Sequence, residues 1–263
     1  MPSSTRSTLR FARSIAFCFL VGLAASALPA AAGWLELEAR YWAPDVSGGG
    51  AVDVGGFPID LELGRDLGLE ADAAPEGRIT IRPGLGFFLR GRYTTLSSDG
   101  IETTDLGFTV GGIAVQLLVE TESVLDFDYG GVALGWQFTS PGKKVRIGPF
   151  VEAKGVRGDA SIQVRALGIS QGFANDFEAG FASAGALLEI QPTDRWQIFA
   201  EASVLIEDDD ADLTDAEVGV RFYPTDVLGL GVGYRTFQVD GTIDGVVLDL
   251  DYDGAFGSVQ LRF

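Results

Sequence analysis

The chain has 263 residues, one cysteine, no histidine and a formal net charge of −18. This length fits one large domain or two small ones. So acidic a chain argues against nucleic acid as a partner, because phosphates require a basic surface, and against simple attraction to anionic lipid. Without histidine there is no ordinary general base near neutral pH, so we expect no enzyme activity.

The first 32 residues are predicted to be an export signal. Arg6, Arg10 and Arg13 precede an apolar run over 14–28, and Pro29 and small residues follow it. An uncleaved membrane anchor is the alternative, since the run is near the lower length limit for a spanning helix. Cleavage after Ala32 would leave a mature chain, 33–263, with a net charge of −21 and no cysteine, hence no disulfide.

The mature region alternates apolar and polar residues, which indicates strands whose two faces meet different surroundings. In "WLELEARYW" (34–42), for example, leucines, alanine and tyrosine alternate with acids, arginine and tryptophan. No stretch keeps a helical period, and the segment near 177–190 is ambiguous because both its faces are small. The alternating segments are 34–42, 78–82, 87–95, 125–138, 145–154, 177–190, 196–204, 216–223, 228–235 and 248–263.

The connections alternate in length. Tight turns with proline are predicted at 82–86, 139–144, 191–195 and 223–227. Longer polar stretches, read as loops, cover 43–75, 100–121, 159–175, 208–213 and 241–247. This pattern predicts an all-β, transmembrane, antiparallel up-and-down β-barrel of about ten strands, with short periplasmic turns and long extracellular loops. Eight or twelve strands stay open, because 100–121 could hold another hairpin.

The chain ends in "SVQLRF", which places Val259, Leu261 and Phe263 on one face of the last strand, where we expect them to meet lipid. In this feature the chain resembles bacterial outer-membrane β-barrel proteins. The resemblance implies that the barrel assembly machinery reads the terminal strand. It also implies a Gram-negative outer membrane with lipid and lipopolysaccharide as surroundings, and a monomer. A soluble barrel of lipocalin type is the rival fold, and its apolar face would point inward.

Two similar stretches, "LDFDYGGV" (125–132) and "LDLDYDGA" (248–255), reverse their apolar phase near a glycine. A β-bulge inserts one residue and exchanges the faces of a strand. We therefore predict bulges at Gly130, Gly131 and Gly254, which would turn the nearby aspartates into the lumen. Without bulges, the aspartates would stand above the membrane in water.

The inward-facing charges are nearly balanced, which favours a structural ion-pair network in a filled lumen. A narrow channel or uptake porin for small, preferably cationic, solutes is the alternative. The predicted network consists of Glu36, Glu38, Arg40, Arg78, Arg82, Arg90, Arg92, Asp126, Asp128, Arg146, Glu152, Lys154, Glu189, Glu201, Glu217, Arg221, Arg235, Asp249 and Asp251.

Two further features leave alternatives open. Gly229, Gly231 and Gly233 could leave space inside the barrel or make room for bulky neighbours such as Phe199 or Arg221. The acidic run "EDDDADLTD" (207–215) could bind calcium, but it lacks the glycine and the final acid of a helix–loop–helix calcium loop. A solvated loop is the preferred interpretation, so no metal site and no cofactor are predicted.

Overall fold

The computed structural model describes residues 34–54, 57–62, 68–110, 113–142, 144–166, 169–206, 211–243 and 246–263. The predicted signal, 1–32, lies outside these residues. No helix long and apolar enough to cross a membrane occurs in the described part of the chain. The strands are β1 (Leu35–Val54), β2 (Phe57–Glu62), β3 (Glu70–Ala71), β4 (Ala74–Gly84), β5 (Phe87–Val110), β6 (Ile113–Trp136), β7 (Phe138–Thr139), β8 (Val145–Ala166), β9 (Ile169–Thr193), β10 (Trp196–Leu205), β11 (Ala211–Phe222), β12 (Leu228–Ile243) and β13 (Val246–Arg262).

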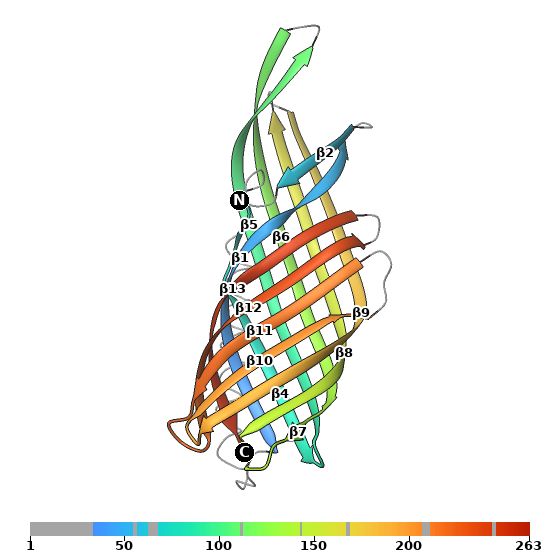
Figure 1. Cartoon of the computed structure of the whole chain (residues 1–263). Coiled ribbons are helices and arrows are strands. Elements are labelled where there is room, and N and C mark those ends of the chain that lie inside the picture. Colours follow the sequence, from blue (N-terminus) through green and yellow to red (C-terminus); the bar gives the residue numbers. More distant parts are fainter. Residues whose placement is uncertain are drawn as a thin grey trace.

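The predicted barrel of ten strands is confirmed. Consecutive strands pair antiparallel from β4 to β6 and from β8 to β13, and β6 pairs with β8. β1 closes the wall by pairing with β13 on one side and β4 on the other. The short strands β2, β3 and β7 each pair with one strand of this wall and are not counted among its ten strands. The predicted turns lie together at one end, where the C-terminus also ends (Figure 1).

The stretches predicted as long loops are mostly strand. β5 and β6 pair without interruption up to Val110↔Ile113, and β8 and β9 pair up to Ala166↔Ile169. The stretch 100–121 therefore extends an existing hairpin instead of adding one. Figure 1 shows β5, β6, β8 and β9 rising beyond the ends of β10 to β13. Polar residues interrupt the apolar pattern of these stretches and so indicate loops, although a strand surrounded by water needs no apolar outer face.

The outer wall has an apolar band at the turn end of the strands. Large apolar side chains such as Leu134, Val151 and Val232 are more than half exposed there. Phe87, Trp136 and Trp196 lie exposed near the turns, and exposed tyrosines lie further up the strands at Tyr41, Tyr93 and Tyr234. An apolar outer band between aromatic girdles is typical of membrane barrels. A lipocalin-type barrel would place this face inside, so that alternative is wrong.

The predicted bulges do not occur. Pairing runs in regular register through Gly130↔Gly155 and Gly131↔Lys154, and Gly254 pairs regularly with both Pro44 and Arg235. The two faces therefore never exchange. Their surroundings change instead, because the outer face passes from lipid to water above the tyrosines and can then carry aspartate.

The inner face changes in the opposite sense at the same height. Aromatic and aliphatic side chains fill the lumen there as one buried cluster, which we call the upper core. Tyr252 lies at its centre, with ring centroids 5.5 Å from Phe127 and 6.5 Å from Trp42. The upper core consists of Trp42, Ala74, Leu96, Leu125, Phe127, Tyr129, Phe199, Leu213, Phe237, Val239, Leu250, Tyr252 and Phe256.

Candidate functional site

Charged side chains fill the lumen below the upper core, and we call them the ion layer. Alternation along each strand points them inward, and most are almost fully buried. The ion layer contains fifteen of the residues predicted for the network. They are Glu36, Glu38, Arg40, Arg78, Arg82, Arg90, Arg92, Arg146, Glu152, Lys154, Glu189, Glu201, Glu217, Arg221 and Arg235.

Four predicted members lie on the outer face, so their assignment to the lumen is wrong. Asp128 and Asp249 are exposed and Asp126 and Asp251 are half exposed, while their neighbours Phe127 and Leu250 are buried in the upper core. The error follows from the bulges that do not form. Regular alternation keeps these aspartates outside, above the apolar band.

Two central acids were missed. Glu76 and Asp215 are both buried in the ion layer, and Arg262 joins its lower rim at 3.6 Å from Glu36. Glu76 directly follows the stretch 43–75, and Asp215 ends the run 207–215, and the sequence predicts a loop for both segments. Their spacing indicates that both acids face the lumen, because each lies two residues before a predicted inward-facing charge, Arg78 or Glu217.

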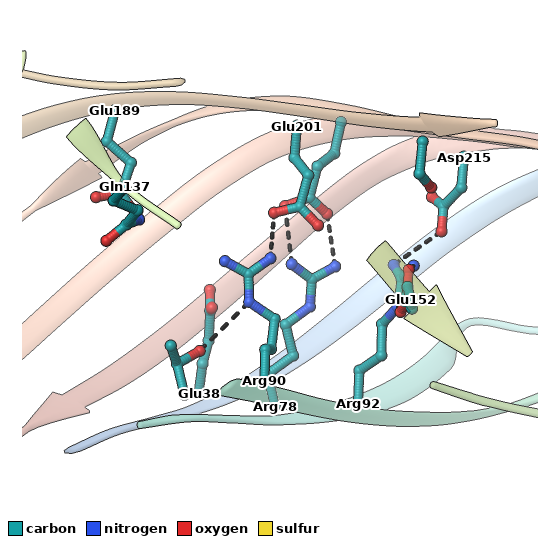
Figure 2. Close-up of polar contacts among 12 residues, drawn as sticks. Glu38, Arg78, Arg90, Arg92, Gln137, Glu152, Glu189, Glu201 and Asp215 are labelled. Atoms are coloured by element: carbon teal, nitrogen blue, oxygen red, sulfur yellow. Dashed lines mark hydrogen bonds and ion pairs between the residues drawn. The ribbon is translucent and has the colours of Figure 1, made fainter. Parts of the chain in front are cut away.

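Glu217 on β11 joins the ion layer to the opposite wall. Its carboxylate accepts hydrogen bonds from Arg40 on β1, with Nη1 to Oε2 at 2.7 Å, and from Arg78 on β4, with Nη2 to Oε2 at 2.6 Å. Arg78 also donates through Nη1 to Oε1 at 2.9 Å, which makes a bidentate pair. Figure 2 shows Arg90 reaching across the lumen toward Glu201, and Arg92 toward Asp215.

Asp215 forms a second centre closer to the upper core. Arg92 contacts Asp215 at 2.8 Å and also donates to both oxygens of Glu152, at 2.7 and 2.6 Å. Arg235 donates to both oxygens of Asp215, at 3.0 and 3.1 Å. Lys154 donates to the Ser203 hydroxyl at 2.8 Å and lies 3.7 Å from Asp215. Several strands therefore converge on one carboxylate.

Further pairs connect the remaining strands nearer the turns. Arg82 pairs with Glu36 and lies 3.1 Å from Glu189, which also contacts Arg146 at 2.6 Å. Arg90 pairs with Glu201 across the lumen. Every carboxylate of the ion layer thus lies within ion-pair distance of at least one base.

Arginine side chains also join the ion layer to the upper core. The Arg235 guanidinium lies 4.8 Å from the Trp42 ring centroid, and that of Arg40 lies 4.5 Å from the Phe256 ring centroid. Tyr129 belongs to the upper core but donates its hydroxyl to Asp215 at 3.0 Å. These contacts satisfy polar groups that would otherwise be costly to bury beside an apolar cluster.

The inward glycines make room for these large side chains. A Cβ at Gly229 would lie 2.7 Å from the Tyr223 ring and 3.1 Å from Arg221 Cδ, and at Gly231 it would lie 2.5 Å from the Ser258 hydroxyl. At Gly233 it would overlap the Phe256 ring. These glycines accommodate bulky neighbours, including Arg221, and do not open a passage. Phe199 packs instead against Gly219.

The terminal strand is only partly as expected. Val259 is exposed on the outer face and Leu261 is half buried there. Phe263 is 5% exposed, so the expectation that its side chain faces lipid is wrong. Its backbone exchanges hydrogen bonds with Leu35, which seals the seam between β13 and β1 at the turn end.

No protein-family model and no curated protein sequence matches this chain. Among solved structures, it resembles the outer membrane protease OmpT of Escherichia coli, with a TM-score of 0.62 and 7% identity over 87% of this chain and 96% of that one. It also matches Neisserial surface protein A, at TM-score 0.35, 12% identity, and 88% and 99% coverage. The attachment invasion locus protein Ail of Yersinia pestis matches at TM-score 0.33, 8% identity, and 88% and 99% coverage.

At these identities the likeness shows the fold alone. A closed barrel of ten antiparallel strands with an apolar outer band and a polar lumen defines an outer-membrane β-barrel. The chain therefore has the fold of a small outer-membrane barrel protein.

Proposed function

We propose that this protein is a closed, non-catalytic barrel with a structural and envelope-interaction role, exerted through its outer wall and tall extracellular strands. The ion pairs that join opposite walls carry the proposal, because a lumen bridged by guanidinium–carboxylate contacts has no free path for solutes. The upper core stacks a second, apolar closure above the ion layer.

The alternative role as a channel for cationic solutes has less support. The ion layer holds eight acids and ten bases, so its charge would not attract cations. Catalysis also lacks support, because the chain has no histidine and each lumen acid is neutralised by a base. The structural role of such networks is consistent with the specificity that buried ion pairs can confer.

The outer wall of the barrel also supports a proposal for the molecules that surround the protein. The apolar band fits lipid, and the strands that rise above it would meet lipopolysaccharide. We also propose that the C-terminal strand is read by the assembly machinery and that the barrel is a monomer.

The test is conductance of the purified, detergent-folded protein in a planar bilayer, with Arg90→Ala plus Arg92→Ala alongside. We expect no steady unitary current from the parent protein, and rare openings at most from the double variant. Its two lost guanidinium groups remove the ion pair of Glu201 and leave Glu152 with Lys154 at 3.7 Å. Circular dichroism and heat-shifted gel mobility would show that both are folded. Steady currents from the parent that change with the substitutions would establish a channel and overturn the proposal.

A further inference from the structure

One edge of β9 is unpaired above the end of β10. β9 has 25 residues and β10 has only 10. Their pairing reaches Leu205↔Ser183, and the last hydrogen bond runs from the Ile206 N–H to the Ala182 carbonyl at 2.8 Å. Beyond this bond, over 169–181, β9 pairs only with β8 among the described residues. A row of backbone donors and acceptors therefore stays open to another strand.

The direction of the open peptide groups follows from the last bond. Ala182 points its carbonyl toward β10, and peptide groups alternate in direction along a strand. The register between β8 and β9 has no bulge. Gly180, Glu178, Asp176 and Ala174 therefore present their N–H and C=O groups to the open edge, and their side chains share the outer face.

The outer face beside this edge is acidic. Asp126, Asp159 and Asp176 are direct neighbours across β6, β8 and β9. Like charges directly opposite one another are destabilising, and the hydrogen bond with Asp176 raises the pKa of Asp159 above its ordinary value. A hollow of about 320 Å³ opens here, and its charged lining is formed by three acids, Asp159, Asp176 and Glu178, and one base, Arg157. Basic side chains from an added strand would relieve this repulsion.

The inner face beside the same edge is apolar. Phe177 and Phe181 are half buried and pack against the upper core, as does Leu205 at the top of β10. A strand added above β10 would place every second side chain on this face. Those side chains must be apolar to continue the packing, whereas the others must be basic to meet the acids outside.

We propose that the open edge of β9 binds an extended peptide segment with alternating basic and apolar residues, which adds as an antiparallel strand. Antiparallel addition continues the direction of β10 and is the slightly more stable pairing. Backbone hydrogen bonds supply affinity and the two faces supply specificity. The inference rests on the proposed interaction role of the extracellular strands and names the class of partner.

Two simpler roles for the acidic edge are protection against pairing and binding of a divalent cation. Charge at an edge can prevent pairing between copies of a protein, in which case no peptide would bind. Binding of a divalent cation is disfavoured, because no group of three or more acids with the geometry of a metal site occurs in the described part of the chain.

The experiment uses the detergent-folded protein and fluorescence anisotropy with a labelled nine-residue peptide of alternating lysine and valine. The lysines of the bound peptide would lie directly opposite Asp176 and Glu178. Because these two residues present their peptide groups to the open edge, each opposite lysine must point its own backbone N–H to β9. A peptide N-methylated at every lysine should therefore bind at least tenfold more weakly, whereas its isomer N-methylated at every valine should bind as the parent does. Both isomers have the same charge and composition.

Matched protein variants complete the design. Asp159→Asn plus Asp176→Asn should weaken binding at least tenfold. Asp240→Asn plus Asp249→Asn, an exposed cross-strand pair on β12 and β13, should change it less than twofold. Equal binding of the two N-methylated isomers, equal effects of the two double variants, or no binding at all would overturn the inference. If the protein conducts no current and binds no peptide, this inference alone is refuted. If it conducts current and binds the peptide, the proposed function alone is refuted.

Discussion

At the scale of single residues, Glu217 shows how the lumen depends on complete pairing. Its carboxylate is buried and accepts hydrogen bonds from two arginines on other strands. Removing one partner from a buried ion pair leaves the opposite charge uncompensated, which costs far more than an exposed pair contributes. The ion layer is therefore a cooperative unit in which one carboxylate supports several strands.

We expect Glu217→Gln to lower the free energy of unfolding by about 3–5 kcal/mol, because Arg40 and Arg78 would each lose one buried counter-charge and keep only Glu38 and Glu76. Urea unfolding in detergent, followed by tryptophan fluorescence, measures this. Glu178→Gln on the exposed outer face is the matched control and should change stability by less than about 0.5 kcal/mol. Equal effects of the two substitutions would refute the structural role of the ion layer.

The raised pKa of Asp159 predicts that its contribution to folding stability falls as the pH rises, whereas that of a salt-bridged acid rises. Its pKa is raised in the folded protein, so folding is penalised once the pH exceeds its ordinary value of 3.8, and the penalty is complete above the raised value. Asp159→Asn should therefore raise the unfolding temperature at pH 7 and have no such effect below the ordinary pKa. Thermal unfolding of parent and variant at pH 3 and pH 7 checks this, and a stabilisation equal at both values would contradict it.

At the scale of elements, glycine has different roles on the two faces of a strand. Gly219 faces inward, where a Cβ would lie 2.5 Å from Phe199 Cζ and 2.8 Å from the Val232 carbonyl oxygen. Gly155 faces outward, and nothing lies within 4 Å of the Cβ that a substitution would add. An inward glycine such as Gly219 on β11 thus allows an aromatic ring to pack directly against the backbone of the barrel wall.

We expect Gly219→Ala to lower the free energy of unfolding by about 1–3 kcal/mol through overpacking. Gly155→Ala should be neutral or raise it by up to about 1 kcal/mol, because glycine is unfavourable inside a strand. Heat-shifted gel mobility and urea unfolding compare the two variants. A greater loss at Gly155 than at Gly219 would show that packing in the lumen does not limit stability.

At the scale of the whole molecule, two cores of opposite chemistry are stacked in one barrel. The ion layer lies inside the apolar outer band, and the upper core lies where the outer face becomes acidic. Each strand that spans both cores therefore changes the polarity of both its faces at one height. The same arrangement supports the walls above the apolar band, because the upper core packs them from inside. Among the described residues, it leaves the edge of β9 unpaired above β10.

The sequence by itself determined the barrel. Alternation with period two, proline turns and an apolar face ending in Val259 and Leu261 are local features, and they predict strands, their order and an antiparallel closed sheet. The same alternation also predicted most of the ion layer, because fifteen charged residues lie on the face opposite the apolar band.

Only the tertiary structure decided which face is inside above the membrane and which charges meet. Alternation shows that Asp126 and Phe127 lie on opposite faces, but it does not show whether water or lumen surrounds each face. Pairing partners such as Glu76 and Arg235 are 159 residues apart and meet across the lumen only when the barrel closes. The medium around a face and the contacts across a lumen are properties of the closed barrel, and a local pattern carries neither.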